Sequence, residues 1–400
     1  MNEEQHAIFS NAYNKRILPA YEKYQADVSL QKNATPWQLV LNIVSEIGGL
    51  DGKDVAILGN YDVACVLAAL EASNGLGVGT DYNFKSLTLL TDVVEFDPNL
   101  KFNDKFKVVV DNLNEPAKID MMGKKFDVVI GNPPYQKGKT SIWQKFTNLG
   151  LSVLKDGGSL AMIHPASYRL KGKHQEISDY FSVMKGFYIQ CLQLSNYQTG
   201  KKLFGDGATT TADWYIVVKE EANGRLTTVT DVDGDVEEMD LSDAAGVPDV
   251  ISLDKDVVSI GDDCLEIVTE TSDFHTQSKS DFLDDFQSEE FKYPAVYSLK
   301  EDGPRMKWSS RKPTKQDFGP KIILANGMGK PVLDLEGEIG LTQFASAILG
   351  EPEELKKIYA GLCTDECVKV IQKAGGGDAH KYSKVGVGFL KKGFYKKFQD

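Results

Sequence analysis

Short apolar runs alternate with longer segments of helical periodicity between residues 54 and 219. Three helix-length segments occur in this stretch, at Val63–Ala72, Ile142–Leu154 and His174–Met184. Strands that alternate with helices predict an α/β fold, in which helices cover both faces of a mainly parallel sheet. The last two apolar runs are close together and could instead pair as an antiparallel edge. The predicted strands are Val55–Leu58, Leu76–Val78, Phe106–Val110, Phe126–Ile130, Ser159–Ile163, Phe187–Leu192 and Trp214–Val218.

The pattern outside this stretch predicts separate domains. Residues 1–30 are polar and partly amphipathic, which predicts a helical segment that leads into the body. Near residue 225 the composition becomes acidic and β-branched, so we place a boundary there and predict domains at 31–225 and 226–400. The second of these mixes strand and helix patterns and is predicted to be α+β. Its expected elements are a strand and turn at Lys321–Lys330, a short apolar helix after Gly340–Phe344, and a helix at Pro352–Leu362.

The composition is that of a globular protein with a sizeable core, since 42% of the 400 residues are hydrophobic and 26% are charged. No apolar run approaches the roughly 18 residues of a membrane helix, and the polar start Met1–His6 does not predict a secretory signal. The five cysteines are scattered and odd in number, which favours a reducing compartment, so we expect a cytoplasmic protein. No metal site is predicted, because Cys363-x3-Cys367 lacks a second ligand pair.

The net charge of −13 is unevenly distributed along the chain. Residues 231–290 contain 20 Asp and Glu against two Lys, which gives −18, so the remaining residues together carry +5. The stretch 292–330 is basic, and residues 381–400 interleave Lys with Tyr and Phe. Basic residues among aromatic ones suit contact with nucleic-acid phosphates, although a solvated face with a frayed tail has the same composition. The overall charge therefore does not exclude DNA as a partner.

The predicted strand Phe126–Ile130 runs into the turn Gly131-Asn132-Pro133-Pro134-Tyr135, the most informative stretch of the chain. The turn is expected at the carboxyl edge of the sheet, where open α/β sheets bind ligands. The prolines stiffen the turn and lack an N–H, so the side-chain oxygen of Asn132 and the carbonyl of Pro133 can both face outward as acceptors. Tyr135 offers a ring for stacking on a planar base. The structural alternative is a rigid turn with a capping Asn.

Two converging acceptors are what an exocyclic amino group requires. The lone pair of an adenine N6 amine is delocalised into the ring, and hydrogen bonds from both N–H groups favour a pyramidal, nucleophilic nitrogen. Attack on a methyl sulfonium then needs in-line geometry more than it needs an acid or a base. The turn therefore predicts methylation of an amino group.

The turn resembles the catalytic motif of S-adenosylmethionine-dependent amino-methyltransferases, especially the DNA adenine-N6 enzymes with a carboxyl-terminal recognition domain. The resemblance covers residues 30–220 and implies a Rossmann-like class I methyltransferase sheet, mostly parallel with an antiparallel last strand, followed by a second α+β domain. It implies a site-specific DNA adenine methyltransferase with S-adenosylmethionine as cofactor, double-stranded DNA as partner, and a restriction endonuclease as counterpart. The implied catalytic residues are Asn132, Pro133, Pro134 and Tyr135.

Other stretches agree with the resemblance in their order along the chain. Thr35-Pro36 resembles an element near the methionine part of the cofactor, and Asp111 ends a strand whose acid contacts the cofactor's adenine. Asp81 would bind the ribose, and Phe204, in a late hairpin, would stack on the flipped base together with Tyr135. The implied cofactor-binding residues are Thr35, Pro36, Gly59, Asn60, Asp81, Asp111, Asn112 and Asn132.

One segment departs from the family's pattern and keeps rival functions open. The first strand of the family usually ends in an acidic or Asn residue followed by a Gly-x-Gly loop, whereas this chain reads Leu58-Gly59-Asn60-Tyr61-Asp62. The first rival is an amino-methyltransferase that acts on RNA or on a protein glutamine, since the same tetrapeptide serves those substrates. The second is a catalytically inactive, methyltransferase-like DNA-binding or specificity subunit.

The region after residue 225 supplies the candidates for DNA contact, which are side chains of the types that bind phosphates and base edges. His164 and Trp214, by contrast, are interpreted as structural residues of the sheet. The predicted phosphate or base contacts are Arg305, Lys307, Arg311 and Lys312, with Asn326 and Gln343 as base readers.

Overall fold

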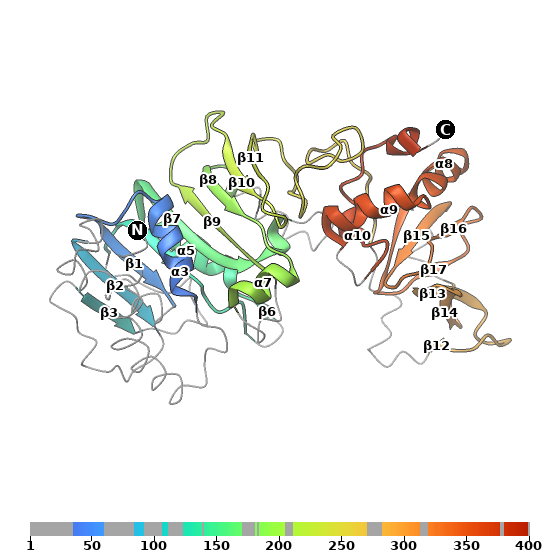
Figure 1. Cartoon of the computed structure of the whole chain (residues 1–400). Helices are drawn as coiled ribbons and strands as arrows, with labels where there is room; N and C mark the ends of the chain where they lie inside the picture. The colour runs from blue at the N-terminus through green and yellow to red at the C-terminus, as the bar shows by residue number, and fades with distance from the viewer. Residues whose placement is uncertain are drawn as a thin grey trace. The chain divides into compact units, whose positions relative to one another are not determined.

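The computed structural model divides the chain into two compact units, each described by itself (Figure 1). The first unit comprises Met1–Ala166, Val183–Thr230 and Val236–Ser242, and the second comprises Ser167–Ser182, Asp231–Asp235 and Asp243–Asp400. The predicted segments 1–30, Val63–Ala72 and Leu76–Val78 lie outside the described residues, and so does most of His174–Met184. The structure describes residues 35–59, 84–91, 106–110, 123–137, 140–169, 181, 184–204, 211–269, 282–312, 319–376 and 380–398.

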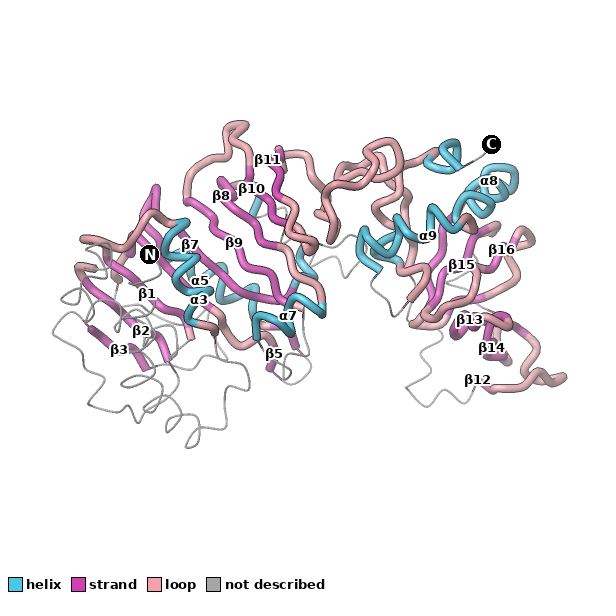
Figure 2. Tube along the Cα trace, in the orientation of Figure 1, coloured by secondary structure: helices cyan, strands magenta, loops and turns pink. Residues whose placement is uncertain are grey.

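A nine-stranded sheet forms the first unit, and its strands lie side by side in Figure 2. Their order across the sheet is β11-β10-β8-β9-β7-β4-β1-β2-β3. The strands are β1 (Asp54–Leu58), β2 (Ser86–Thr91), β3 (Phe106–Val110), β4 (Phe126–Gly131), β7 (Leu154–Pro165), β8 (Tyr188–Gln193), β9 (Ala212–Val218), β10 (Thr227–Thr230) and β11 (Val236–Met239).

The direction of these strands confirms the predicted class I methyltransferase sheet. Strands β3, β2, β1, β4 and β7 are parallel to one another. Strand β9 runs antiparallel to both of its neighbours, β7 and β8. The last two predicted strands, β8 and β9, therefore pair antiparallel as expected. They do not form an edge of the sheet, because β9 lies between β7 and β8, and β8 also pairs with β10.

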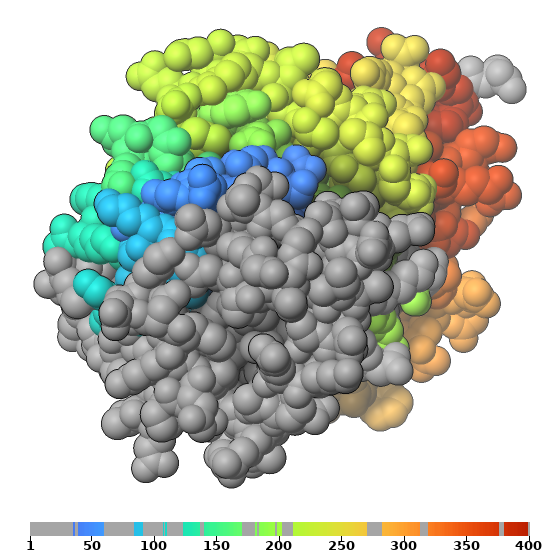
Figure 3. Space-filling view, turned by 60° about the vertical axis from the view of Figure 1, so that its left-hand side comes forward, coloured from blue at the N-terminus to red at the C-terminus, as the bar shows by residue number. Residues whose placement is uncertain are grey.

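Apolar burial on both faces explains why these runs form central strands. All five residues of β1 are buried, as expected for a strand that helices cover on both sides. Helix α5 (Trp143–Val153), within the predicted Ile142–Leu154, buries Phe146 and Leu149. Helix α3 (Trp37–Glu46) buries Val40 and Ile43; it lies at the surface in Figure 3. The remaining elements are α7 (Tyr197–Phe204), the short strands β5 (Gln136–Lys137) and β6 (Thr140–Ser141), and the helical turn η5 (Ala166–Arg169).

A buried carboxylate connects the strands at the amino edge of the sheet. The side chain of Asp54, at the start of β1, accepts a hydrogen bond of 2.6 Å from Ser86 Oγ. Lys85 and Lys124 each place Nζ 3.0 Å from its carboxylate oxygens. Burial alone would raise the pKa of Asp54, but the hydrogen bonds from Ser86, Lys85 and Lys124 outweigh it and hold the pKa well below its usual range.

The variant Asp54→Asn is expected to lower the free energy of unfolding at pH 7 by about 2 kcal/mol, because hydrogen bonds to a charged acceptor are lost. A depressed folded-state pKa means that the stabilisation is complete above the ordinary Asp pKa of about 4 and is lost as the pH falls through the folded value. Urea unfolding at several pH values should therefore show a difference from wild type that shrinks below pH ~4. Asp51→Asn, at an exposed position beside the same strand, is the control; equal effects of the two changes would contradict the role of the network.

The second unit contains two further sheets and several helices. One sheet has the order β12-β14-β13-β17 and the other has the order β16-β15-β18. Their strands are β12 (Leu283–Asp284), β13 (Tyr293–Lys300), β14 (Gly303–Ser309), β15 (Lys321–Ala325), β16 (Val332–Asp334), β17 (Gly340–Leu341) and β18 (Ala345–Leu349). The helices and helical turns are α8 (Pro352–Leu362), α9 (Asp365–Ile371), η6 (Gln372–Gly376), α10 (Lys384–Val387) and η7 (Phe394–Phe398).

Two predictions for the second unit are confirmed and one is wrong. A strand occurs at Lys321–Ala325, and α8 has the bounds predicted for it. The apolar segment after Phe344 is strand β18, not a helix. It pairs antiparallel with all five residues of β15, and such tertiary pairing commonly overrides the weak local preference of a short apolar run.

Several aromatic residues of the carboxyl-terminal segment are core residues, which corrects both interpretations of residues 381–400, the phosphate-contacting surface and the solvated face with a frayed tail. Tyr382, Phe389 and Phe394 are buried in one cluster together with apolar residues of α8 and α9. Lysines of this segment also pair with the acidic stretch 231–290. Lys391 contacts Asp263, and Lys397 lies 3.3 Å from Asp254 and 3.4 Å from Asp256. Part of the acidic stretch thus balances the basic carboxyl terminus within the same unit.

Within the described ranges, no helix is both long enough and apolar enough to cross a membrane.

Candidate active site

The two central strands of the sheet end side by side at the point where the strand order reverses. Leu58 of β1 and Gly131 of β4 are direct partners in the parallel register. Gly59 and Asn132, the residues that follow them, therefore leave the sheet next to each other at its carboxyl edge. In open α/β sheets a crevice forms at this topological switch point, and ligands bind there. The fold thus places the segment after β1 and the Asn-Pro-Pro-Tyr turn after β4, both predicted to belong to the site, next to each other.

Gly59 has a backbone conformation that favours glycine. Its φ is +77°, and its N–H donates a hydrogen bond of 3.0 Å to the carbonyl of Leu90, near the end of β2. Side-chain-bearing residues are strained in this left-handed region. The position therefore keeps a bare, half-buried backbone at the carboxyl edge, where a ligand can approach it closely.

Three side chains form a hydrogen-bonded chain at the end of β4. Asn132 Nδ2 donates to Thr35 Oγ1 at 3.1 Å, and the hydroxyl of Tyr135 donates to Asn132 Oδ1 at 2.9 Å. Thr35 is 2% exposed, whereas Asn132 is only half-buried. Together these bonds fix the plane of the Asn132 amide. An amide oxygen has two lone pairs, so Oδ1 is an atom of the kind that accepts more than one hydrogen bond.

The turn that carries Asn132 is anchored on both sides. Gly131 is buried, and a Cβ atom at this position would lie 3.0 Å from the sulfur of Met162. Pro133 is buried and Pro134 exposed. Beyond the turn, the carbonyl of Tyr135 accepts a hydrogen bond of 3.0 Å from the N–H of Ile142, and the short pair β5–β6 lies between them. A turn held in this way presents its polar groups with little freedom.

Burial raises the pKa of Tyr135, and the charge of Asp213 raises it further. Asp213 lies on β9, is fully buried, and accepts a hydrogen bond of 2.7 Å from the N–H of Ser195. The phenol is therefore protonated at neutral pH and can act as the donor to Asn132. Asp213 is not among the site residues predicted from the sequence. The signal that could have indicated it is a carboxylate within an otherwise apolar strand.

His164 has the structural role that the sequence reasoning gave it. It is fully buried, its ring stacks on Trp143 with centroids 4.1 Å apart, and its Nε2 lies 2.9 Å from the hydroxyl of Tyr215. Burial lowers the pKa of His164 to about 3, so the imidazole is neutral. Trp214 is buried as well, as predicted.

The strand beside β1 is not the predicted second strand. The sequence placed the second strand at Leu76–Val78, but β1 has β2 (Ser86–Thr91) on one side and β4 on the other. Asp81 lies outside the described residues, so its role as ribose ligand stays a prediction. The residue that directly follows β2 in the sequence is Asp92.

Other predicted site residues are placed differently or are not described. Phe204 is the last residue of helix α7, and not part of a hairpin as the resemblance implied. Asn60, Asp81, Asp111 and Asn112 lie outside the described residues. Within the described part of the chain, no group of three or more His, Cys, Asp or Glu residues could hold a metal ion.

The structure separates the predicted DNA-contacting residues into two sets. Arg305 and Asn326 line one pocket of the second unit. Lys307 is instead paired with Asp285, and the guanidinium of Arg311 lies 4.5 Å from the ring centroid of Phe282. Lys312 and Gln343 do not line that pocket.

Residues 79–198 match the Eco57I restriction-modification methylase family. This stretch contains the strands β2, β3, β4, β7 and β8, and it includes the turn at Asn132. The first unit is a methyltransferase domain. The match covers less than a third of the chain and does not reach most of the second unit.

Individual relatives are similar over different parts of the chain. The rRNA N(6)-adenosine-methyltransferase metl-5 of Caenorhabditis elegans is 24% identical over 157 residues, which are 38% of this chain and 71% of the relative. The DNA-bound type IIL restriction-modification enzyme MmeI covers 95% of this chain and 66% of its own, with 10% identity and a TM-score of 0.46. The type IIG restriction endonuclease BpuSI covers 97% of this chain and 60% of its own, with 10% identity and a TM-score of 0.42.

Proposed function

We propose that this chain transfers a methyl group from S-adenosylmethionine to the N6 amino group of a flipped adenine at specific sites in DNA. The observation that carries the proposal is the oriented amide of Asn132, which is held by Thr35 and Tyr135 at the carboxyl end of β4. No other described residue of this edge combines a fixed acceptor with a stiff, proline-containing turn.

Asn132 and Pro133 act on the amino group of the substrate. One amino hydrogen is donated to Asn132 Oδ1, and the other is donated to the carbonyl of Pro133. These two bonds draw the nitrogen lone pair out of conjugation with the ring, so that it becomes nucleophilic. Fixed acceptors of this kind stabilise the charge that develops on the nitrogen in the transition state. No general base with a shifted pKa is required at this point.

The carboxyl edge of the sheet suits a nucleoside cofactor. Gly59, whose φ is in the left-handed region, has no side chain to cover the backbone there. Thr35 accepts a hydrogen bond from the amide of Asn132. When bound, S-adenosylmethionine supplies an electrophilic methyl group. By resemblance, Pro36, Asn60, Asp111 and Asn112 hold the cofactor as well. Asp81 is the ribose ligand that the resemblance implies, and Asp92, which directly follows β2, is a second candidate for that role.

The adenine has to leave the duplex before its amino group can reach Asn132, because the active-site turn cannot enclose the amino group of a base that is still paired and stacked. Tyr135 stacks on one face of the flipped base, and Phe204 is proposed for the other face. The second unit serves as the target-recognition region, with double-stranded DNA as partner and a restriction endonuclease as counterpart. The family match to restriction-modification methylases supports DNA as partner and a restriction endonuclease as counterpart.

RNA adenine is the second candidate substrate. It is favoured by the relative of Caenorhabditis elegans, whose name specifies an rRNA adenosine as the acceptor. The chemistry at Asn132 is the same for both polymers, so the choice of polymer is a property of the groups that bind the backbone.

A transfer assay with labelled S-adenosylmethionine over duplex DNA, structured RNA and protein tests the proposal. We expect label in DNA, at N6 of adenine after hydrolysis to nucleosides. Label in RNA alone would favour the second candidate. Calorimetry with S-adenosylmethionine separates both from an inactive subunit, since an absence of binding at millimolar cofactor would contradict any methyltransferase activity.

A further inference from the structure

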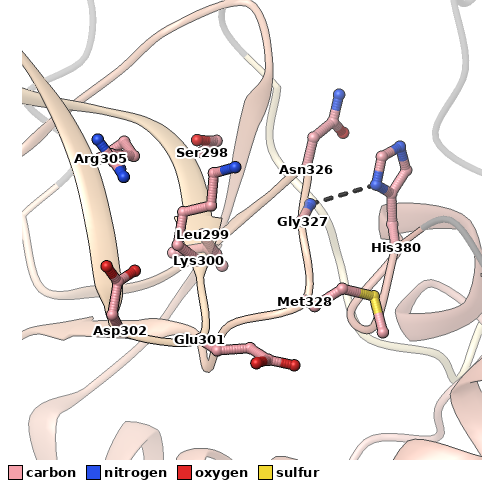
Figure 4. A pocket seen from close by; sticks show the side chains of 10 residues that line it. All are labelled: Ser298, Leu299, Lys300, Glu301, Asp302, Arg305, Asn326, Gly327, Met328 and His380. Atoms are coloured by element: carbon pink, nitrogen blue, oxygen red, sulfur yellow. Dashed lines mark hydrogen bonds between the residues drawn. The ribbon is translucent and has the colours of Figure 1, made fainter.

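A pocket of about 680 Å³ opens in the second unit between a β-hairpin and a glycine-containing turn (Figure 4). The hairpin consists of β13 and β14, and in its register Ser298 lies opposite Arg305 while Lys300 lies opposite Gly303. Because side chains alternate between the faces of a strand, Ser298, Lys300 and Arg305 share one face. This face forms one wall of the pocket.

The other wall is the turn after β15, which approaches the hairpin more closely than side chains would allow. A Cβ atom on Gly327 would lie 1.9 Å from the carbonyl oxygen of Leu299, and one on Gly329 would lie 2.0 Å from that of Lys300. Two backbone hydrogen bonds close the contact: Leu299 N–H donates to Asn326 O at 2.9 Å, and Gly329 N–H donates to Leu299 O at 3.1 Å. The turn is therefore fixed through its backbone, and the side chain of Asn326 is left exposed.

His380 completes the pocket from a distant part of the chain. Its Nδ1 accepts a hydrogen bond of 3.2 Å from the N–H of Gly327, and the neighbouring Lys381 N–H donates to Gly327 O at 3.0 Å. A neutral imidazole that accepts at Nδ1 carries its proton on Nε2. His380 thus fixes the turn and offers one N–H donor.

The lining combines groups of opposite hydrogen-bonding character. Lys300, Arg305 and His380 are donors, Asn326 is both donor and acceptor, and Glu301 and Asp302 at the hairpin tip are acceptors (Figure 4). Two exposed carboxylates disfavour a bare phosphate. A ligand that shows donors and acceptors side by side on a planar edge fits instead, and this is the character of a base pair in the major groove of DNA.

We propose that this pocket reads base edges in the major groove of the target DNA, an inference that rests on the function proposed above. Arg305 is placed to bind a guanine edge and Asn326 an adenine edge, which are the pairings that the geometry of these side chains favours. A β-hairpin is also one of the elements that the major groove admits. His380 is a positioning residue, because it holds the turn that carries Asn326.

The test compares the full-length wild type with Arg305→Ala and Asn326→Ala, both at exposed positions. Each protein methylates a duplex library, and the modified adenines are mapped by sequencing. We expect each variant to relax discrimination about tenfold at one or two base positions, the amount that one bidentate contact contributes, while the other positions keep their preference. Lys356→Ala is the matched control, because Lys356 is an exposed cation of α8 outside the pocket.

Asn326→Asp keeps the size of the side chain and replaces a donor with an acceptor, so a change of preferred base is expected at the position that Asn326→Ala relaxes. Unchanged specificity in all three pocket variants would overturn the inference and leave the proposed function intact. A uniform loss of affinity for every sequence would also overturn it, because that result identifies phosphate contacts. Absence of methyl transfer to DNA by the wild type would overturn both proposals.

Discussion

Asn132→Ala is expected to reduce methyl transfer by about 10²–10³-fold or more, the loss typical when a fixed hydrogen-bonding group that stabilises a transition state is removed. The side chain offers the one oriented acceptor amide of the turn, and alanine leaves the substrate's amino group with the Pro133 carbonyl alone. Cofactor binding should change little, since Gly59 and the strands of the sheet remain in place. Single-turnover transfer rates and calorimetry with S-adenosylmethionine measure the two effects separately.

Two further variants test whether the loss of transfer is specific to the amide of Asn132. Asn148→Ala is the matched control, because Asn148 is an exposed asparagine of α5 away from the turn. Tyr135→Phe removes only the hydroxyl that donates to Asn132 Oδ1 and keeps the stacking ring, so transfer should fall by no more than about tenfold. Wild-type rates for Asn132→Ala would exclude the proposed mechanism. A loss of cofactor binding equal to the loss of transfer would assign the residue to the cofactor instead.

Breaking the buried ion pair of the second unit should have the largest effect on stability. Lys321 of β15 and Asp334 of β16 are direct partners in the antiparallel register, with Nζ and Oδ2 2.7 Å apart. Their side chains are 0% and 4% exposed. Lys321→Met leaves the carboxylate buried without its cation, and we expect the free energy of unfolding to fall by about 3–5 kcal/mol. Urea unfolding and amide hydrogen exchange in β15 measure the change.

The exposed pair Lys356–Glu353 provides the comparison. Lys356→Ala should lower the free energy of unfolding by at most about 1 kcal/mol, because solvent screens the charges. Asp334→Ala should cost as much as Lys321→Met or more, since Asp334 also accepts hydrogen bonds from the N–H groups of Gly337, Glu338 and Ile339. If Lys321→Met and Lys356→Ala destabilise equally, burial does not strengthen the pair.

Local apolar pattern was sufficient to locate most strands of the first unit. The runs at Val55, Phe106, Phe126 and Trp214 all lie in observed strands, because strands of a mainly parallel sheet consist mostly of apolar residues. The apolar pattern did not predict strand β2. Its sequence, Ser86-Leu87-Thr88-Leu89-Leu90-Thr91, mixes hydroxyl and apolar residues, although Thr88 is fully buried.

The second unit shows where pattern alone misleads. Interleaved Lys and aromatic residues at 381–400 left a nucleic-acid surface and a solvated face with a frayed tail as open interpretations, whereas Phe389 and Phe394 are buried in the core and Lys397 is paired with acids of the 231–290 stretch. A sequence shows that a residue is aromatic, but it does not show which other elements cover it. Burial of this kind depends on helices α8 and α9, which pack against the segment.

The sequence by itself determined the alternation of strands and helices, the Asn-Pro-Pro-Tyr turn after a buried strand, and the division of charge within the chain. These features depend on residues that are neighbours in the sequence. Only the tertiary structure decided that Thr35 meets Asn132 across 97 positions, that β2 rather than an earlier segment adjoins β1, and that His380 holds the turn carrying Asn326. Contacts between distant segments follow from strand pairing and core packing, for which a single sequence carries no local signal.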